Sequence, residues 1–178
     1  NRLTHSLEVA SVGRSLGRIF YNSYKKQNPL VDQEIPLLQE IDTIIATACL
    51  AHDLGNPAFG HSGESAISAY FTGKGSEYKS KLTEEQWADL VSFEGNANAL
   101  RILTNNFNGK DKSGFALTYS SLAAIIKYPC SAIKGGYKKR LHRKKYGYFQ
   151  SDKDAFLKIV NELSILKEEE DVYKRHPL

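Results

Sequence analysis

Apolar residues recur at helical spacing along almost the whole chain. Two stretches show this pattern best, residues 4–22 and the strongly apolar stretch 38–51. In the first stretch, the predicted buried stripe consists of Leu7, Ala10, Leu16, Ile19 and Phe20. The second stretch ends at the helix breakers Gly55 and Pro57, and its apolar character predicts a helix at the centre of the fold.

The remaining predicted elements are shorter. Helices are expected over residues 62–71, from a capping box that begins at Thr83, over residues 93–103 and 118–127, and from the cap at Ser151 to Leu166. Loops are expected at 72–82 and 105–114. Strand-like alternation is weak, and a small hairpin near 146–150 is its best candidate. The pattern predicts an all-α fold in which residues 1–178 form one domain.

Composition fits an ordinary globular chain. Hydrophobic residues make up 41% of the 178 residues and charged residues 25%. The sequence shows neither a membrane-spanning run nor a signal peptide, and Cys49 and Cys130 lack Cys-x-x-Cys spacing. We therefore expect reduced thiols, a buried Cys49, a cytoplasmic location and no membrane partner. The chain begins without Met, so we expect its N-terminus to be a cut.

Charge is unevenly distributed although the net charge is only +4. Basic residues crowd the stretch from Lys134 to Lys145, and acidic residues fill 168–171. One interpretation of the basic stretch is a solvated face. The other is a groove for single-stranded nucleic acid, since aromatic residues are interleaved with the charges: Tyr137, Tyr146, Tyr148 and Phe149.

The pair His52-Asp53 is the first candidate for chemistry. It stands at the end of the apolar helix, just before the Gly/Pro break. A neutral imidazole beside a carboxylate can bind one divalent ion or bridge two, although the dipeptide alone is common by chance. His5, in the first turn of the first helix, is a candidate third ligand, because a helical bundle can bring the two helix ends together. The alternative for His5 is a surface histidine.

Several motifs together resemble the dGTPase branch of the HD superfamily. They are Arg-Leu-Thr-His-Ser-Leu-Glu-Val at residues 2–9, Ala-His-Asp-Leu-Gly-Asn-Pro-Ala-Phe-Gly-His-Ser-Gly-Glu at 51–64, and Phe-Glu-Gly-Asn-Ala at 93–97. Further matches follow at 117–129 and 144–151. The resemblance implies an HD-domain helical bundle, truncated at both ends. It further implies hydrolysis of a dNTP to deoxynucleoside and inorganic triphosphate, with dGTP as the first candidate substrate.

The same resemblance assigns residue roles. His5, His52 and Asp53 match ligands of a divalent metal ion, expected to be Mg²⁺ or Mn²⁺. His61 matches the catalytic histidine and Glu64 its acidic partner, although Glu64 also suits the first turn of a helix. Six residues match positions around the substrate or a metal-bound water: Arg2, Asn56, Asn96, Lys127, Tyr128 and Lys145. For the last four of these, a capped or solvated helix end is the alternative.

The resemblance also predicts what this chain lacks. The family's fourth metal ligand is an Asp that follows a stretch like Arg175-His176-Pro177-Leu178, so we expect it beyond Leu178 and expect this fragment alone to be inactive. A homo-oligomer is implied as well. Two other functions stay open: another HD phosphohydrolase, acting on a nucleoside monophosphate or a guanosine alarmone, and a regulator that binds nucleotide or nucleic acid without turnover.

Overall fold

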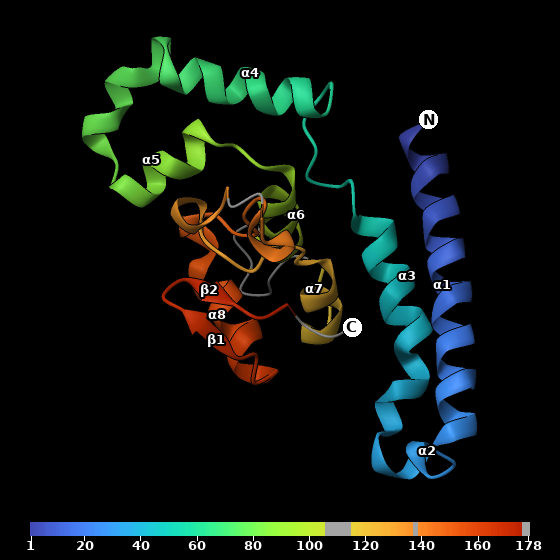
Figure 1. Cartoon of the computed structure of the whole chain (residues 1–178). Coiled ribbons are helices and arrows are strands. Elements are labelled where there is room, and N and C mark those ends of the chain that lie inside the picture. Colours follow the sequence, from blue (N-terminus) through green and yellow to red (C-terminus); the bar gives the residue numbers. More distant parts are fainter. Residues whose placement is uncertain (106–114, 137–138, 176–178) are drawn as a thin grey trace.

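The structure is a computed structural model that describes residues 1–105, 115–136 and 139–175. Its main elements are helices, which confirms the predicted all-α class (Figure 1). The α-helices are α1 (Arg2–Gln27), α2 (Val31–Glu34), α3 (Ile41–Ala51), α4 (His61–Thr72), α5 (Glu84–Val91), α6 (Gly95–Thr104), α7 (Tyr119–Ile125) and α8 (Lys153–Glu162). Short 3-10 turns join them: η1 (Pro36–Glu40), η2 (Lys74–Lys81), η3 (Ala132–Lys134), η4 (Leu141–Arg143) and η5 (Gln150–Asp152).

Helices α1 and α3 lie side by side as a pair at one edge of the molecule (Figure 1). The predicted stripe on α1 is wrong: Leu7, Leu16, Ile19 and Phe20 are each about half exposed or more. The buried residues of α1 are Gly13, Gly17 and Tyr21, which recur every four residues. A Cβ atom at Gly17 would lie 2.7 Å from the Asp42 Cα, so a close backbone approach, rather than large side chains, forms this interface.

The body of the molecule is formed by α6, α7, α8 and the chain around them (Figure 1). Its main cluster contains Leu100, Leu103, Leu122, Ala123, Ile126, Tyr148, Phe156, Ile159, Val160 and Tyr173. The Tyr148 and Phe156 rings stack with centroids 4.3 Å apart. A smaller cluster joins Ala97, Cys130, Tyr146, Phe149 and Val172. Ala51, at the end of α3, packs against the main cluster and so connects the α1–α3 pair to the body.

The hairpin predicted near 146–150 is wrong. The aromatic residues of this stretch face two different clusters. Tyr148 packs in the main cluster, whereas Tyr146 and Phe149 pack in the smaller one, so the pattern reflects burial on both sides. The strands are instead β1 (Lys167–Glu169) and β2 (Val172–Tyr173), paired antiparallel, and Cys130 adds a bridge to Val172. Helix α8 ends at Glu162, short of the predicted Leu166, because Ser164 adopts φ 51°.

Other element predictions agree with the structure within a few residues. The capping box at Thr83 is present, with both reciprocal hydrogen bonds to Gln86. The predicted loop at 72–82 contains η2. The predicted turn at 105–114 lies outside the described residues except for Asn105, which caps α6. Among the described helices, none is both long and apolar enough to cross a membrane.

Candidate metal centre and catalytic site

The predicted metal ligands meet where α1 and α3 end side by side. His5 lies in the first turns of α1, His52 caps the C-terminus of α3, and Asp53 follows in the turn. Their potential ligand atoms all lie within 4.8 Å of one another. The His5 and His52 rings meet edge to face, with centroids 5.3 Å apart. Within the described ranges, this is the one group of three or more such side chains with metal-binding spacing.

Hydrogen bonds orient two of these three side chains. The His52 Nδ1 lies 2.7 Å from the Cys49 carbonyl oxygen, so it donates there and leaves the Nε2 lone pair available as a ligand. The Asn56 Nδ2 donates to the Asp53 Oδ1 at 2.8 Å. Asn56 thus contacts a candidate ligand directly, whereas its predicted contact with a metal-bound water stays a prediction.

His61 and Glu64 form a second cluster at the start of α4. The loop before it passes through Phe59 (φ 65°) and Gly60 (φ 56°), both in the left-handed region, and His61 begins the helix. The His61 Nδ1 lies 2.7 Å from the Glu64 Oε2. The imidazole is 83% exposed while the Glu64 side chain is 11% exposed. An exposed imidazole ring is therefore held by a buried carboxylate.

The surroundings of Glu64 favour its ionised form. Burial alone would raise its pKa, but the hydrogen bonds from His61 and from the Gly95 N–H, together with the Lys145 charge, lower the pKa below its ordinary value. The Gly95 N–H donates to the Glu64 Oε1 at 2.8 Å. Only glycine fits at residue 95, because a Cβ there would lie 2.4 Å from the Asn56 Oδ1 and 2.9 Å from the Glu64 Oε1.

Lys145 connects Glu64 to Glu94, a residue that the sequence analysis missed. The Lys145 Nζ lies 2.9 Å from the Glu94 carboxylate and 3.8 Å from the Glu64 Oε2. Glu94 also caps α6 and accepts hydrogen bonds from the backbone and the side chain of Asn96. Its place directly before Gly95, in the Phe-Glu-Gly-Asn-Ala block, was the available signal.

A cleft of about 600 Å³ opens between these two clusters. Eight predicted site residues line it: His52, Asp53, Asn56, His61, Asn96, Lys127, Tyr128 and Lys145. Lys144 and Arg175, which had no predicted role, line it too. Four cationic side chains therefore face one cavity, which suits an anionic ligand.

Three predicted residues do not line the cleft. His5 and Glu64 belong to the two clusters described above but are not part of the cleft lining. Arg2 donates from its guanidinium to the carbonyl oxygens of Asn56 and Pro57, at 3.3 and 3.1 Å. It therefore secures the turn after α3 and does not reach into the cavity.

The nucleic-acid groove that the sequence raised as an alternative loses support. Tyr146, Tyr148 and Phe149 are each at least nine-tenths buried, so they cannot stack on nucleic-acid bases, and Tyr137 lies outside the described residues. The basic stretch is also partly neutralised, since Arg143 pairs with Glu169 and His142 with Glu168.

Among the acidic residues that the structure describes, none besides Asp53 joins the metal cluster. Asp152 contacts Arg101, and Asp171 pairs with Lys153 at 2.8 Å. Asp154 lies in the first turn of α8, outside the cluster. Cys49, which was predicted to be buried, is only half-buried, whereas Cys130 is buried, and both are free thiols.

Comparison with known proteins agrees with this geometry. The family model described as "HD domain" matches residues 2–128. A Pseudomonas aeruginosa protein named "Deoxyguanosinetriphosphate triphosphohydrolase-like protein" is 37% identical over 99% of this chain and 39% of its own length. One with the same name from Listeria monocytogenes is 38% identical over 99% of this chain and 38% of its own length. A Yersinia pestis "Deoxyguanosinetriphosphate triphosphohydrolase" is 34% identical over the whole chain and 39% of its own length.

The chain therefore spans about two fifths of the length of these curated relatives. The family match covers both candidate clusters, from Arg2 on α1 to Tyr128 in the cleft wall. The chain belongs to the HD domain family.

Proposed function

We propose that this protein is a metal-dependent phosphohydrolase that cleaves a dNTP into deoxynucleoside and inorganic triphosphate, with dGTP as the first candidate substrate. The observation that carries the proposal is the convergence of His5, His52 and Asp53 beside a cleft with four cationic side chains. The names of the relatives supply the substrate class.

The three converging side chains suit a divalent ion. They offer two imidazole nitrogens and a carboxylate oxygen, and the hydrogen bond from His52 to Cys49 leaves one of those nitrogens unprotonated. Imidazole ligands suit Mn²⁺ and other transition ions, whereas Mg²⁺ prefers oxygen ligands, so the proposal favours Mn²⁺ over Mg²⁺. When bound, such an ion makes water more acidic and neutralises phosphate charge.

His61 and Glu64 handle the proton in this proposal. Cleavage at the α-phosphorus leaves the 5′-oxygen of the deoxynucleoside in need of a proton. His61 donates its Nδ1–H to Glu64, which directs Nε2 outward; the exposed ring, once protonated, can give the Nε2 proton to that oxygen. The ionised Glu64 stabilises the imidazolium that carries this proton.

The cations of the cleft hold the substrate. Three of these cations, Lys127, Lys144 and Arg175, form no ion pair with an acidic side chain among the described residues. Their charge is therefore available for a triphosphate. Lys145 shares its charge between Glu94 and Glu64. It therefore stands between the phosphate-binding wall and the proton-handling pair, where it can serve both.

Product analysis tests the proposal. The full-length protein is incubated with each dNTP and Mn²⁺ or Mg²⁺, and ³¹P NMR follows the products. The proposal predicts intact triphosphate together with deoxynucleoside, and release slower by about 10²-fold or more from His61→Ala. Pyrophosphate with a nucleoside monophosphate would contradict it. Turnover only of a nucleoside monophosphate or a guanosine alarmone would select the other HD phosphohydrolases, and binding without turnover would select a regulator.

A further inference from the structure

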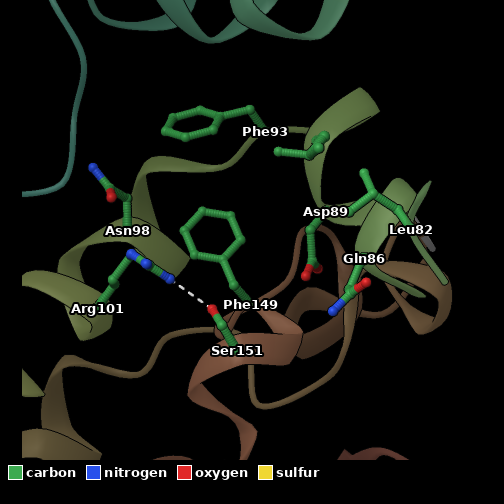
Figure 2. Close-up of a pocket in the computed structure, with 9 residues that line it drawn as sticks. Leu82, Gln86, Asp89, Phe93, Asn98, Arg101, Phe149 and Ser151 are labelled. Atoms are coloured by element: carbon green, nitrogen blue, oxygen red, sulfur yellow. Dashed lines mark hydrogen bonds between the residues drawn. The ribbon is translucent and has the colours of Figure 1, made fainter. Parts of the chain in front are cut away.

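A second cavity lies away from the cleft, between α5 and α6. We call it the α5–α6 cavity; its volume is about 350 Å³, and it shares no lining residue with the cleft. Its apolar wall consists of Leu82, Leu90, Phe93 and Phe149, and its polar wall includes Gln86, Asp89 and Arg101. Figure 2 shows the Asp89 and Gln86 side chains on one side of the space and Arg101 on the other. This volume lies within the range of small-molecule sites.

Asp89 is the feature that a ligand would explain. Asp89 is buried, with only 5% of the residue exposed, and its Oδ2 accepts the Gln150 N–H at 2.6 Å. The Oδ1 is buried and has no hydrogen-bond partner among the described residues. An unsatisfied buried carboxylate oxygen is costly, so a donor inside the cavity would complete it. Burial also raises the Asp89 pKa to about 7, because the ionised carboxylate is poorly stabilised at this position.

Gln86 places a donor beside that acceptor. It precedes Asp89 by three residues, so both side chains share one face of α5. The Gln86 Oε1 is occupied by the capping box, where it accepts the Thr83 N–H at 3.0 Å. Its Nε2 is therefore available. The pair presents an acceptor next to a donor, which is the complement of the hydrogen-bonding edge of a nucleobase.

The other walls select a flat and uncharged ring. Phe93 and Phe149 lie with ring centroids 5.7 Å apart and tilted by 39°, so they offer an aromatic surface but no space between them. Arg101 is the one cation of the lining, and it already contacts the Ser151 Oγ at 2.6 Å and Asp152 at 3.4 Å. With the Asp89 carboxylate opposite, an anionic phosphate is disfavoured inside this cavity.

We propose that the α5–α6 cavity is a second small-molecule site, which binds the base of a nucleoside through Asp89 and Gln86. The base lies against Phe93 and Phe149, donates an N–H to the Asp89 Oδ1, and accepts the Gln86 Nε2–H. The ribose faces the open side of the cavity. This site does not depend on the proposed catalytic function, because it shares no residue with the cleft.

Titration calorimetry of the full-length protein tests the proposal, with adenosine as the probe. Adenosine offers an amino donor beside a ring acceptor, and N6,N6-dimethyladenosine has the same ring without the N–H. We expect saturable binding of adenosine and binding weaker by about tenfold or more for the dimethyl analogue, because the Asp89 acceptor would stay unpaired.

Variants locate the binding. Gln86→Leu, at an exposed position of α5, is expected to weaken adenosine binding by about tenfold without unfolding the protein. Asp89→Leu should abolish it, and Glu85→Gln, on α5 but outside the cavity lining, is the matched control. Absence of adenosine binding would mean that only water fills the cavity and would overturn the proposal. Equal binding by wild type and Gln86→Leu would also overturn it, since the nucleoside would then occupy the cleft.

Discussion

Asp53 and Glu64 are both carboxylates of the candidate site, yet their surroundings differ. The Asp53 side chain is 31% exposed, and its contacts come from His52 and Asn56 in the same turn. The Glu64 side chain is 11% exposed, and its contacts come from α4, from the start of α6 and from Lys145. The His61–Glu64 pair is therefore held by contacts from several parts of the fold, whereas the proposed metal cluster of His5, His52 and Asp53 is more open. The predictions below test this difference.

Replacing His61 should have the largest effect. We expect His61→Ala to lower turnover by about 10²-fold or more, because the leaving oxygen loses its proton donor. Steady-state assays with dGTP and Mn²⁺ measure this. His142→Ala, which removes a histidine from outside the cleft lining, is the matched control and should leave turnover unchanged. Equal turnover of wild type and His61→Ala would remove His61 from the mechanism.

A methyl group at residue 95 should destabilise the packing around Glu64. We expect Gly95→Ala to lower the free energy of unfolding by about 1–3 kcal/mol, because the new Cβ would press on Asn56 and Glu64. Urea denaturation measures the loss. Glu84→Ala, at the first position of α5, introduces alanine at an equivalent helix position in open surroundings and should change stability little. A fully stable Gly95→Ala would show that the contact between α6 and the turn after α3 is loose.

Lys145 should tune the proton-handling pair as well as bind phosphate. We expect Lys145→Met to lower kcat/KM about tenfold and to move the acidic limb of the pH–rate profile to higher pH, because loss of the positive charge raises the pKa of Glu64. Lys144→Met removes an equal charge from the same cleft without a recorded contact to Glu64, so its acidic limb should move less. An unshifted limb in Lys145→Met would separate Lys145 from Glu64.

Asp89 should make stability depend on pH in the opposite sense from a paired carboxylate. Its folded-state pKa is raised to about 7, so the stability that it contributes is present at low pH and is lost as the pH rises through that value. Asp89→Asn should therefore stabilise the protein by about 1–3 kcal/mol more at pH ~8 than at pH ~5. Denaturation at the two pH values measures this, and an equal effect at both would contradict it.

Local sequence signals predicted part of this site well. The helix end at His52-Asp53, the capping box at Thr83 and eight residues of the cleft wall could be inferred, because each depends on a short motif or on the family resemblance. Lys144 and Arg175, which also line the cleft, were given no role. Predictions that depended on distant packing were weaker. The apolar stripe of α1 was wrong because glycines, which no hydrophobic pattern marks, form the interface with α3.

Glu94 shows the same limit within the site. Its capping role is local, but its ion pair with Lys145 joins residues 51 positions apart, and no spacing rule relates them. The α5–α6 cavity likewise depends on Phe149 and Ser151 meeting α5 and α6 in space. Such contacts become visible only in the fold.

The claim that His5, His52 and Asp53 form the metal site is tested most directly by counting bound Mn²⁺ in the purified full-length protein and its variants. The account predicts stoichiometric Mn²⁺ in wild type and in His61→Ala, and loss of the tightly bound ion in His5→Ala and in Asp53→Asn. Retention of the ion by both His5→Ala and Asp53→Asn, or its loss from His61→Ala, would contradict the assignment.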